Sequence, residues 1–292
     1  MKPAPFEYTR ARTIDEALGW LVRDAEAKLL AGGQSLVPLM NLRLARPSRL
    51  IDINPVAGLA SIAAAPDGGL VIGALTRHCE LVTSALIRER APLLAAAAAH
   101  VGHRAIRNRG TLGGSLAHAD PAAELPAAVL ALGATLVGAG PGGRRRIAAD
   151  DFFLGPFATA LAAQEILTEI EVPPQRHHAW GFAEIARRAG DFAIAGVCAV
   201  LGSEGRPAAA RLVAFGADDR PIRLTASEKL LTGATVTPDG AAAAAGAATR
   251  CVSPADDVHA SADYRRHLVG VLTERVLREA GRRLPGAAAG AR

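Results

Sequence analysis

The feature that most constrains this chain is a glycine-rich stretch at residues 106–126, which lies between two apolar, alanine-rich runs. Gly110, Gly113 and Gly114 are interspersed there with Thr111 and Ser115. Because glycine has no Cβ atom, consecutive backbone amides can turn toward one point and approach an anion closely. The N-terminus of a helix expected at residues 122–132 would add to the positive potential. The stretch therefore predicts a loop that binds an anion, with phosphate the favoured ligand.

A second glycine turn occurs much earlier in the chain, at Ala31-Gly32-Gly33-Gln34-Ser35-Leu36, directly after a short apolar run that is typical of a strand. Either turn alone is equally consistent with a surface loop that binds nothing. Together, two glycine turns that each precede a small polar residue favour an extended diphosphate gripped from both sides, as in a dinucleotide. Neither turn has the Gly-x-Gly-x-x-Gly pattern of a Rossmann unit, and no Walker lysine follows either one.

Composition narrows the possible classes of protein. The 292 residues are enough for about two domains with their own cores. We find no apolar run of about 18 residues that would span a membrane and no N-terminal secretory pattern, so the expected location is the cytoplasm. Three scattered cysteines are too few to ligate an iron–sulfur cluster, and an aromatic content of 4% gives little support to nucleic-acid binding.

The order of expected elements predicts an α+β protein in three parts. Residues 1–57 form a small β-α-β unit, in which Thr13 and Glu16 make a capping box for the first helix. Residues 58–175 form a larger α+β unit. Two consecutive prolines, Pro173 and Pro174, interrupt the pattern, and residues 176–285 are expected to form a three-stranded antiparallel sheet with helices.

Four blocks of the sequence resemble one known family. They are Ala-Gly-Gly-Gln-Ser at 31–35, Arg-Asn-Arg-Gly-Thr-Leu-Gly-Gly-Ser-Leu-Ala-His-Ala-Asp-Pro at 107–121, Arg-Arg-Ala-Gly-Asp-Phe-Ala at 187–193 and Tyr-Arg-Arg-His-Leu at 264–268. The chain is similar over nearly its whole length to the FAD-binding medium subunits of molybdenum hydroxylases, which include the flavoprotein subunits of carbon monoxide, xanthine, nicotinate and aldehyde dehydrogenases.

The resemblance implies FAD as the cofactor, with its diphosphate held by both glycine loops. It also places Glu124, where the family often has aspartate, on the adenosine side, and the loop with Asp191 and Phe192 beside the isoalloxazine. Phe192 replaces the tyrosine of some relatives and cannot donate a hydroxyl hydrogen bond. The candidate cofactor-binding residues are Ala31, Gly32, Gly33, Gln34, Ser35, Leu36, Thr111, Gly113, Gly114, Ser115, His118, Asp120, Glu124, Arg187, Asp191 and Phe192.

Three of these candidates have a second interpretation. Asp120, before Pro121, is either a turn or cap residue or a direct FAD ligand. His118 is a candidate FAD contact, and it is not a metal ligand because no second ligand stands at a suitable spacing. Arg187, beside Arg188, neutralises the diphosphate, anchors its own loop or docks a partner protein.

The sequence contains no set of residues spaced for hydrolysis, and no catalytic residue is assigned, because in a flavin enzyme the cofactor carries the chemistry. By resemblance, a large partner subunit with a molybdenum cofactor hydroxylates the substrate, and a small [2Fe-2S] subunit passes the electrons to FAD in this chain. Reduced FAD then reduces NAD or another acceptor, and the assembly is a heterotrimer. The alternatives are a stand-alone FAD-dependent oxidase or dehydrogenase and a cofactor-free assembly subunit.

Overall fold

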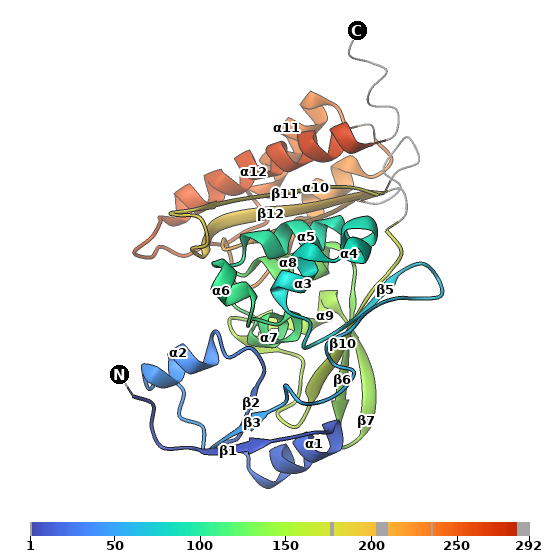
Figure 1. The fold of residues 1–292 in the computed structure, drawn as a ribbon. Helices are drawn as coiled ribbons and strands as arrows, with labels where there is room; N and C mark the ends of the chain where they lie inside the picture. Colours follow the sequence, from blue (N-terminus) through green and yellow to red (C-terminus); the bar gives the residue numbers. More distant parts are fainter. Residues whose placement is uncertain (1, 176–177, 203–209, 235, 285–292) are drawn as a thin grey trace.

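The computed structural model describes residues 2–175, 178–202, 210–234 and 236–284. They form a mixed α/β structure with a three-stranded, a five-stranded and a four-stranded sheet and a two-stranded hairpin. In Figure 1 the small N-terminal sheet lies at the bottom and the C-terminal sheet lies near the top beneath the long helix α12. Within these residues, no helix combines the length and the apolar character that crossing a membrane would need.

The N-terminal unit is a parallel sheet in the order β1-β3-β2, with α1 packed against it. Thr13 caps α1 by accepting from the Glu16 amide, which is one half of the predicted capping box. The other half differs, because the Glu16 carboxylate accepts from the Arg12 amide at 2.7 Å and not from the Thr13 amide. Because the strands are parallel, the carboxyl ends of β2 and β3 meet at one edge of the sheet. The elements are β1 (Glu7–Arg10), α1 (Ile14–Arg23), β2 (Lys28–Leu30), α2 (Leu36–Asn41) and β3 (Arg49–Asp52).

The second unit is an antiparallel sheet in the order β4-β5-β10-β6-β7, with a group of short helices above it. Every residue of α8 is buried, which fits a helix that is apolar on all sides. The elements are β4 (Ile62–Ala64), β5 (Leu70–Gly73), α3 (His78–Thr83), α4 (Ala85–Arg90), α5 (Pro92–His100), α6 (Arg104–Arg107), α7 (Leu112–His118), α8 (Glu124–Ala131), β6 (Thr135–Gly140), β7 (Gly143–Ala148), α9 (Ala149–Phe152), β8 (Phe153–Gly155), β9 (Ala158–Thr159) and β10 (Ile166–Val172).

The C-terminal unit is an antiparallel sheet in the order β11-β12-β13-β14. One face of this sheet meets α5 and α8 of the second unit, and α12 covers the other face with α11 against it. All of β12 is therefore buried. The elements are β11 (His178–Ala186), β12 (Ala193–Gly202), β13 (Ala210–Phe215), β14 (Ile222–Arg223), α10 (Thr225–Leu231), α11 (Pro238–Ala248) and α12 (Ala262–Arg283).

The predicted three-stranded C-terminal sheet is wrong in its number of strands. The fourth strand, β14, has only two residues, Ile222 and Arg223, which pair with Ala214 and Val213 of β13. A two-residue segment is too short to show the alternation of apolar and polar residues by which strands are recognised in sequence.

Candidate functional site

The first glycine turn, residues 31–36 (loop 1), leaves the carboxyl edge of the parallel sheet after β2 and leads into α2. Gly33 has φ +73°, a backbone conformation that favours glycine, and the Gln34 side-chain amide donates to the Gly32 carbonyl at 3.1 Å. The backbone amides of Gly32, Gly33, Gln34 and Ser35 donate no hydrogen bond to any other residue that the structure describes. Four successive unpaired amides at a glycine turn are the donors that an anion-binding nest requires.

The second glycine segment, residues 108–115 (loop 2), differs from the expected open loop because α7 begins at Leu112. The Thr111 hydroxyl caps this helix by accepting from the Gly114 amide at 3.1 Å. The Ser115 amide donates to the Thr111 carbonyl at 3.0 Å. The Thr111 oxygen thus holds the helix start as an acceptor, its hydroxyl hydrogen stays available to donate, and its contact with a ligand stays a prediction.

Loop 2 is also fastened to the segment that follows β5. The amides of Leu112 and Gly113 donate to the Thr76 and Ala74 carbonyls at 2.9 Å and 2.7 Å. A Cβ atom added to Gly113 would lie 2.7 Å from the Ala74 carbonyl oxygen, so glycine is needed there for packing. The amides at the start of α7 are thus paired within the protein, and loop 1 is left as the source of free amides.

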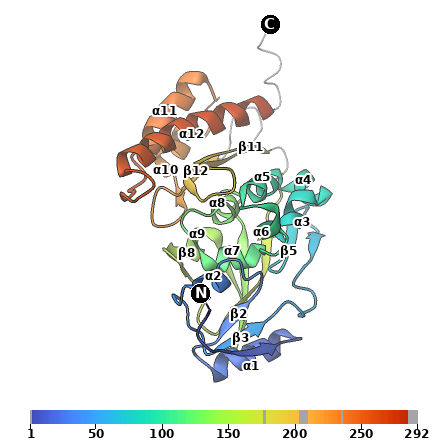
Figure 2. The same cartoon turned by 60° about the vertical axis from the view of Figure 1, so that its left-hand side comes forward.

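The two loops lie in contact with each other. A Cβ atom added to Gly32 would overlap the Arg109 carbonyl oxygen and lie 2.8 Å from the Gly110 Cα atom. A Cβ atom on Gly114 would lie 3.9 Å from that of Ala31. Figures 1 and 2 both show α7, which loop 2 leads into, between the small N-terminal sheet and the C-terminal unit. This contact is what a shared ligand requires, and diphosphate binding by the two loops stays a prediction.

His78 packs its side chain against loop 2 at Gly110. Its side chain is buried at 5% exposure, and a Cβ atom on Gly110 would lie 2.8 Å from its Nδ1 atom. Its backbone amide donates to the Gly110 carbonyl at 3.0 Å. Burial lowers the pKa of His78 to about 4, so the ring under the loop is neutral at neutral pH.

This burial predicts acid sensitivity. The unfolded chain takes up a proton at His78 near pH 6.5 and the native chain only near pH 4, so stability is present above pH 6.5 and is lost as the pH falls toward 4. The unfolding free energy of wild type should fall between pH 7 and pH 4, and we expect His78→Phe to remove up to about 3 kcal/mol of this fall, measured by urea unfolding at the two pH values. His259→Phe, at an exposed histidine, should leave the pH dependence of the unfolding free energy unchanged. Equal pH profiles for wild type and His78→Phe would contradict this expectation.

Glu124 lies in the first turn of α8, where its side chain is 5% exposed. Burial raises the pKa of Glu124 to about 8, and the nearby Glu184 carboxylate adds to the rise. The Glu184 carboxylate of β11 accepts from His100 Nδ1 at 3.0 Å, and this hydrogen bond raises the pKa of His100. The structure thus places Glu124 at the contact between the second and C-terminal units, and its adenosine role stays a prediction.

Two other candidates lie at the carboxyl end of α7. The His118 ring is half-buried and packs on the Phe157 ring with centroids 5.0 Å apart, and burial lowers the pKa of His118. The Asp120 carboxylate accepts from the Ala122 amide at 2.9 Å. This geometry favours the turn interpretation of Asp120 over the ligand interpretation.

The remaining candidates, Arg187, Asp191 and Phe192, lie exposed on the turn between β11 and β12. Phe192 has 66% of its surface exposed. Gly190, with φ +85°, presses this turn against the Gly102 carbonyl, where an added Cβ atom would lie 2.9 Å from the oxygen. The turn therefore brings the C-terminal unit to the segment between α5 and α6.

A cleft of about 560 Å³ lies beside this turn. Its charged lining comes from α5, α6 and β11 and their flanks, namely His100, His103, Arg104, Arg107, Glu184 and Arg188. This group matches no spacing motif, because Glu184 and Arg188 are far along the chain from its other four members. The signal available was the density of arginine and histidine at residues 100–109.

Comparison with known proteins decides the family. Residues 4–175 match the model of the FAD binding domain in molybdopterin dehydrogenase, and residues 180–280 match that of the CO dehydrogenase flavoprotein C-terminal domain. The chain is a molybdenum hydroxylase medium subunit. FAD is the cofactor of this family, and its members are subunits of oxidoreductases.

Curated relatives and solved structures agree with this assignment. The 6-hydroxypseudooxynicotine dehydrogenase complex subunit alpha of Paenarthrobacter nicotinovorans is 42% identical to this medium subunit, over 96% of each chain. The nicotine 6-hydroxylase medium subunit of the same organism is 41% identical, over 97% of this chain and all of the relative. A carbon monoxide dehydrogenase structure from Hydrogenophaga pseudoflava matches 97% of this chain and 100% of its own at 39% identity, with a TM-score of 0.94.

The backbone donors of this medium subunit fit the negative charge of the FAD diphosphate. Loop 1 offers unpaired amides, and Gly32 of this loop packs directly against the backbone of loop 2. Among the described residues, no group of three or more histidine, cysteine, aspartate or glutamate side chains could hold a metal ion. The site is thus suited to a nucleotide anion bound by backbone donors.

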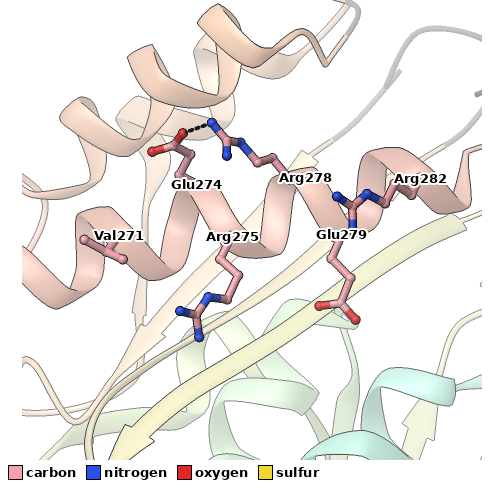
Figure 3. A pocket seen from close by; sticks show the side chains of 6 residues that line it. All are labelled: Val271, Glu274, Arg275, Arg278, Glu279 and Arg282. Carbon is pink, nitrogen blue, oxygen red and sulfur yellow. Dashed lines mark hydrogen bonds and ion pairs between the residues drawn. The ribbon is translucent and has the colours of Figure 1, made fainter. Parts of the chain in front are cut away.

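A second pocket, of about 510 Å³, lies on the exposed side of α12 (Figure 3). Its lining residues all belong to this one helix, and Glu274 and Arg278 among them form an ion pair. In Figure 1, α12 lies at the opposite end of the medium subunit from the small N-terminal sheet. This pocket is therefore not part of the candidate cofactor site.

Proposed function

We propose that this medium subunit is the electron-transfer flavoprotein of a molybdenum-containing hydroxylase. In this proposal, electrons from the iron–sulfur clusters of a small [2Fe-2S] partner reach FAD, after a large molybdenum subunit has oxidised the substrate, and pass on to NAD or another acceptor. The names of the relatives as medium or alpha subunits of complexes support partner subunits. The three cysteines of this chain are too few to ligate such clusters, so a partner must supply them.

The observation that carries the proposal is the contact between two glycine loops, one of which has four unpaired amides. Loop 1 donates those amides to the diphosphate, while loop 2, fixed by its own hydrogen bonds, supports loop 1 and presents the Ser115 hydroxyl. In the same proposal, the exposed Phe192 ring covers one face of the isoalloxazine. Bound FAD supplies the redox chemistry, and the protein supplies its position and electrostatic surroundings.

We also propose the domain limits 1–57, 58–175 and 176–285. The second limit falls between the two segments that match separate family models, 4–175 and 180–280. Residues 176 and 177, at which the C-terminal domain is proposed to begin, lie outside the described residues. The cytoplasmic location stays a prediction.

Purification from its own host tests this function. We expect a yellow protein that releases one FAD per chain and that co-purifies with a large molybdenum-containing subunit and a small iron–sulfur subunit, quantified by absorbance and metal analysis. A flavin-containing protein without these partners would support the stand-alone oxidase or dehydrogenase instead. A colourless protein that added FAD cannot reconstitute would support the cofactor-free assembly subunit.

A further inference from the structure

Asn54 and Arg77 form a hydrogen-bonded bridge between the two loops. The Asn54 side-chain amide donates from Nδ2 to the Ala31 carbonyl of loop 1 at 2.9 Å. The Arg77 guanidinium donates from Nη2 to Asn54 Oδ1 at 2.6 Å and from Nη1 to the Arg109 carbonyl of loop 2. That carbonyl oxygen is also the atom against which Gly32 packs. The bridge therefore ends at the point where the loops meet.

The orientation of Asn54 is fixed by its neighbours in the N-terminal unit. The buried Asp52 carboxylate at the end of β3 accepts from both the backbone amide and Nδ2 of Asn54, at 3.0 Å and 2.6 Å. The Tyr8 hydroxyl holds the other oxygen of Asp52 at 2.5 Å. Because Nδ2 faces only oxygen acceptors, namely Asp52 Oδ1 and the Ala31 and Leu30 carbonyls, the amide oxygen must face Arg77.

Arg77 is held equally firmly in the second unit. Its backbone pairs with Thr111 in an isolated antiparallel bridge, and its amide donates to the Glu80 carboxylate at 2.8 Å. Its planar guanidinium offers separate N–H groups to Asn54 and to Arg109, a geometry that the single ammonium of lysine does not reproduce. Among the described residues, no carboxylate forms an ion pair with Arg77, so its fork is committed to these two acceptors.

This bridge adds hydrogen bonds to an apolar contact between the two units, against which Ala31 of loop 1 also packs. The core cluster of the N-terminal unit receives Leu75 and Ile166 from the strands and loops of the second unit. Apolar contacts of this kind hold the units together but do not fix direction, whereas hydrogen bonds do. A small change in the separation of the loops would misplace the free amides of loop 1 relative to a shared ligand.

We infer that Asn54 and Arg77 are positioning residues that fix the separation of the two glycine loops for the FAD diphosphate. The inference rests on the proposed function, since it assumes that the diphosphate binds where the loops meet. Neither side chain is required to touch FAD. Their effect on binding is exerted through the carbonyls of Ala31 and Arg109.

A double-mutant cycle on the release of FAD tests this role. In the full-length chain, Asn54→Ala and Arg77→Ala should each speed FAD release by about tenfold or more, followed by flavin fluorescence. The double variant should release FAD little faster than either single variant, because the bridge is lost once. Arg77→Lys should also release FAD faster than wild type, and Arg88→Ala, an exposed arginine of α4, should behave as wild type.

The unfolding free energy of each apo form, measured by urea titration, separates loss of positioning from loss of the fold. If Asn54→Ala or Arg77→Ala does not fold, Arg77→Lys keeps the charge and decides the question by its release rate. Wild-type release rates in the folded variants, or fully additive effects in the double variant, would overturn the inference. Failure of the wild-type chain itself to bind FAD would instead overturn the proposed function.

Discussion

Gly32→Ala should weaken FAD binding by at least about 100-fold, or about 2.8 kcal/mol, the largest effect that we expect from one substitution in the site. The new Cβ atom would overlap the Arg109 carbonyl oxygen and approach the Gly110 Cα atom to 2.8 Å. Both are backbone atoms, which cannot turn aside as the end of a flexible side chain can. The loops must therefore separate, and the amides of loop 1 no longer face a ligand held by both.

The measurement is titration of the apo chain with FAD, followed by the quenching of flavin fluorescence. Gly19→Ala is the matched control, because Gly19 lies inside α1 with nothing within 4 Å of an added Cβ atom. Alanine is favoured over glycine in a helix, so this control should keep its affinity and gain a little stability. Undiminished FAD affinity in a folded Gly32→Ala variant would mean that the contact between the loops does not shape the cofactor site.

Glycine placement is the part of the site that local sequence could reveal. The turn at Gly33 follows from residues a few positions apart in the chain. Local sequence does not reveal whether the backbone amides of the two loops are paired within the protein. Leu112 and Gly113 donate to the Thr76 and Ala74 carbonyls, and no local pattern shows that this earlier segment lies alongside loop 2. The expected open nest at loop 2 therefore became a capped helix.

The residues that sequence analysis missed share this cause. Asn54 and Arg77 match no motif, and each acquires its role only because the end of β3 and the start of α3 lie beside different loops. The charged cleft around His100 and Glu184 likewise draws on α5 and β11, which the fold brings together from distant parts of the chain. The strand β14 was missed for a local reason, since two residues are too few to show the alternation of apolar and polar side chains that marks a strand.

Glu124→Gln should abolish a marked loss of stability at alkaline pH. Because burial raises the pKa of Glu124 from 4.5 to about 8, the native chain keeps a proton that the unfolded chain has already lost between these values. This contribution to stability is fully present below pH 4.5 and is lost as the pH rises to 8. The cost above pH 8 is up to about 5 kcal/mol, at 1.36 kcal/mol per pKa unit between 4.5 and about 8, and relaxation around the buried charge lowers it.

Glutamine keeps the shape of the protonated carboxyl group and cannot ionise, so the variant should match wild type at pH 5 and exceed it in unfolding free energy at pH 9. Urea unfolding of the apo chain at pH 5, 7 and 9 measures this difference. Glu26→Gln, an exposed carboxylate in the N-terminal unit, should change neither value. Wild type and Glu124→Gln falling in parallel above pH 5 would show that the Glu124 carboxyl group ionises without cost. A carboxylate that ionises without cost is hydrated or paired. In that case the contact between α8 and the C-terminal sheet would have to open at Glu124 to admit water or a partner.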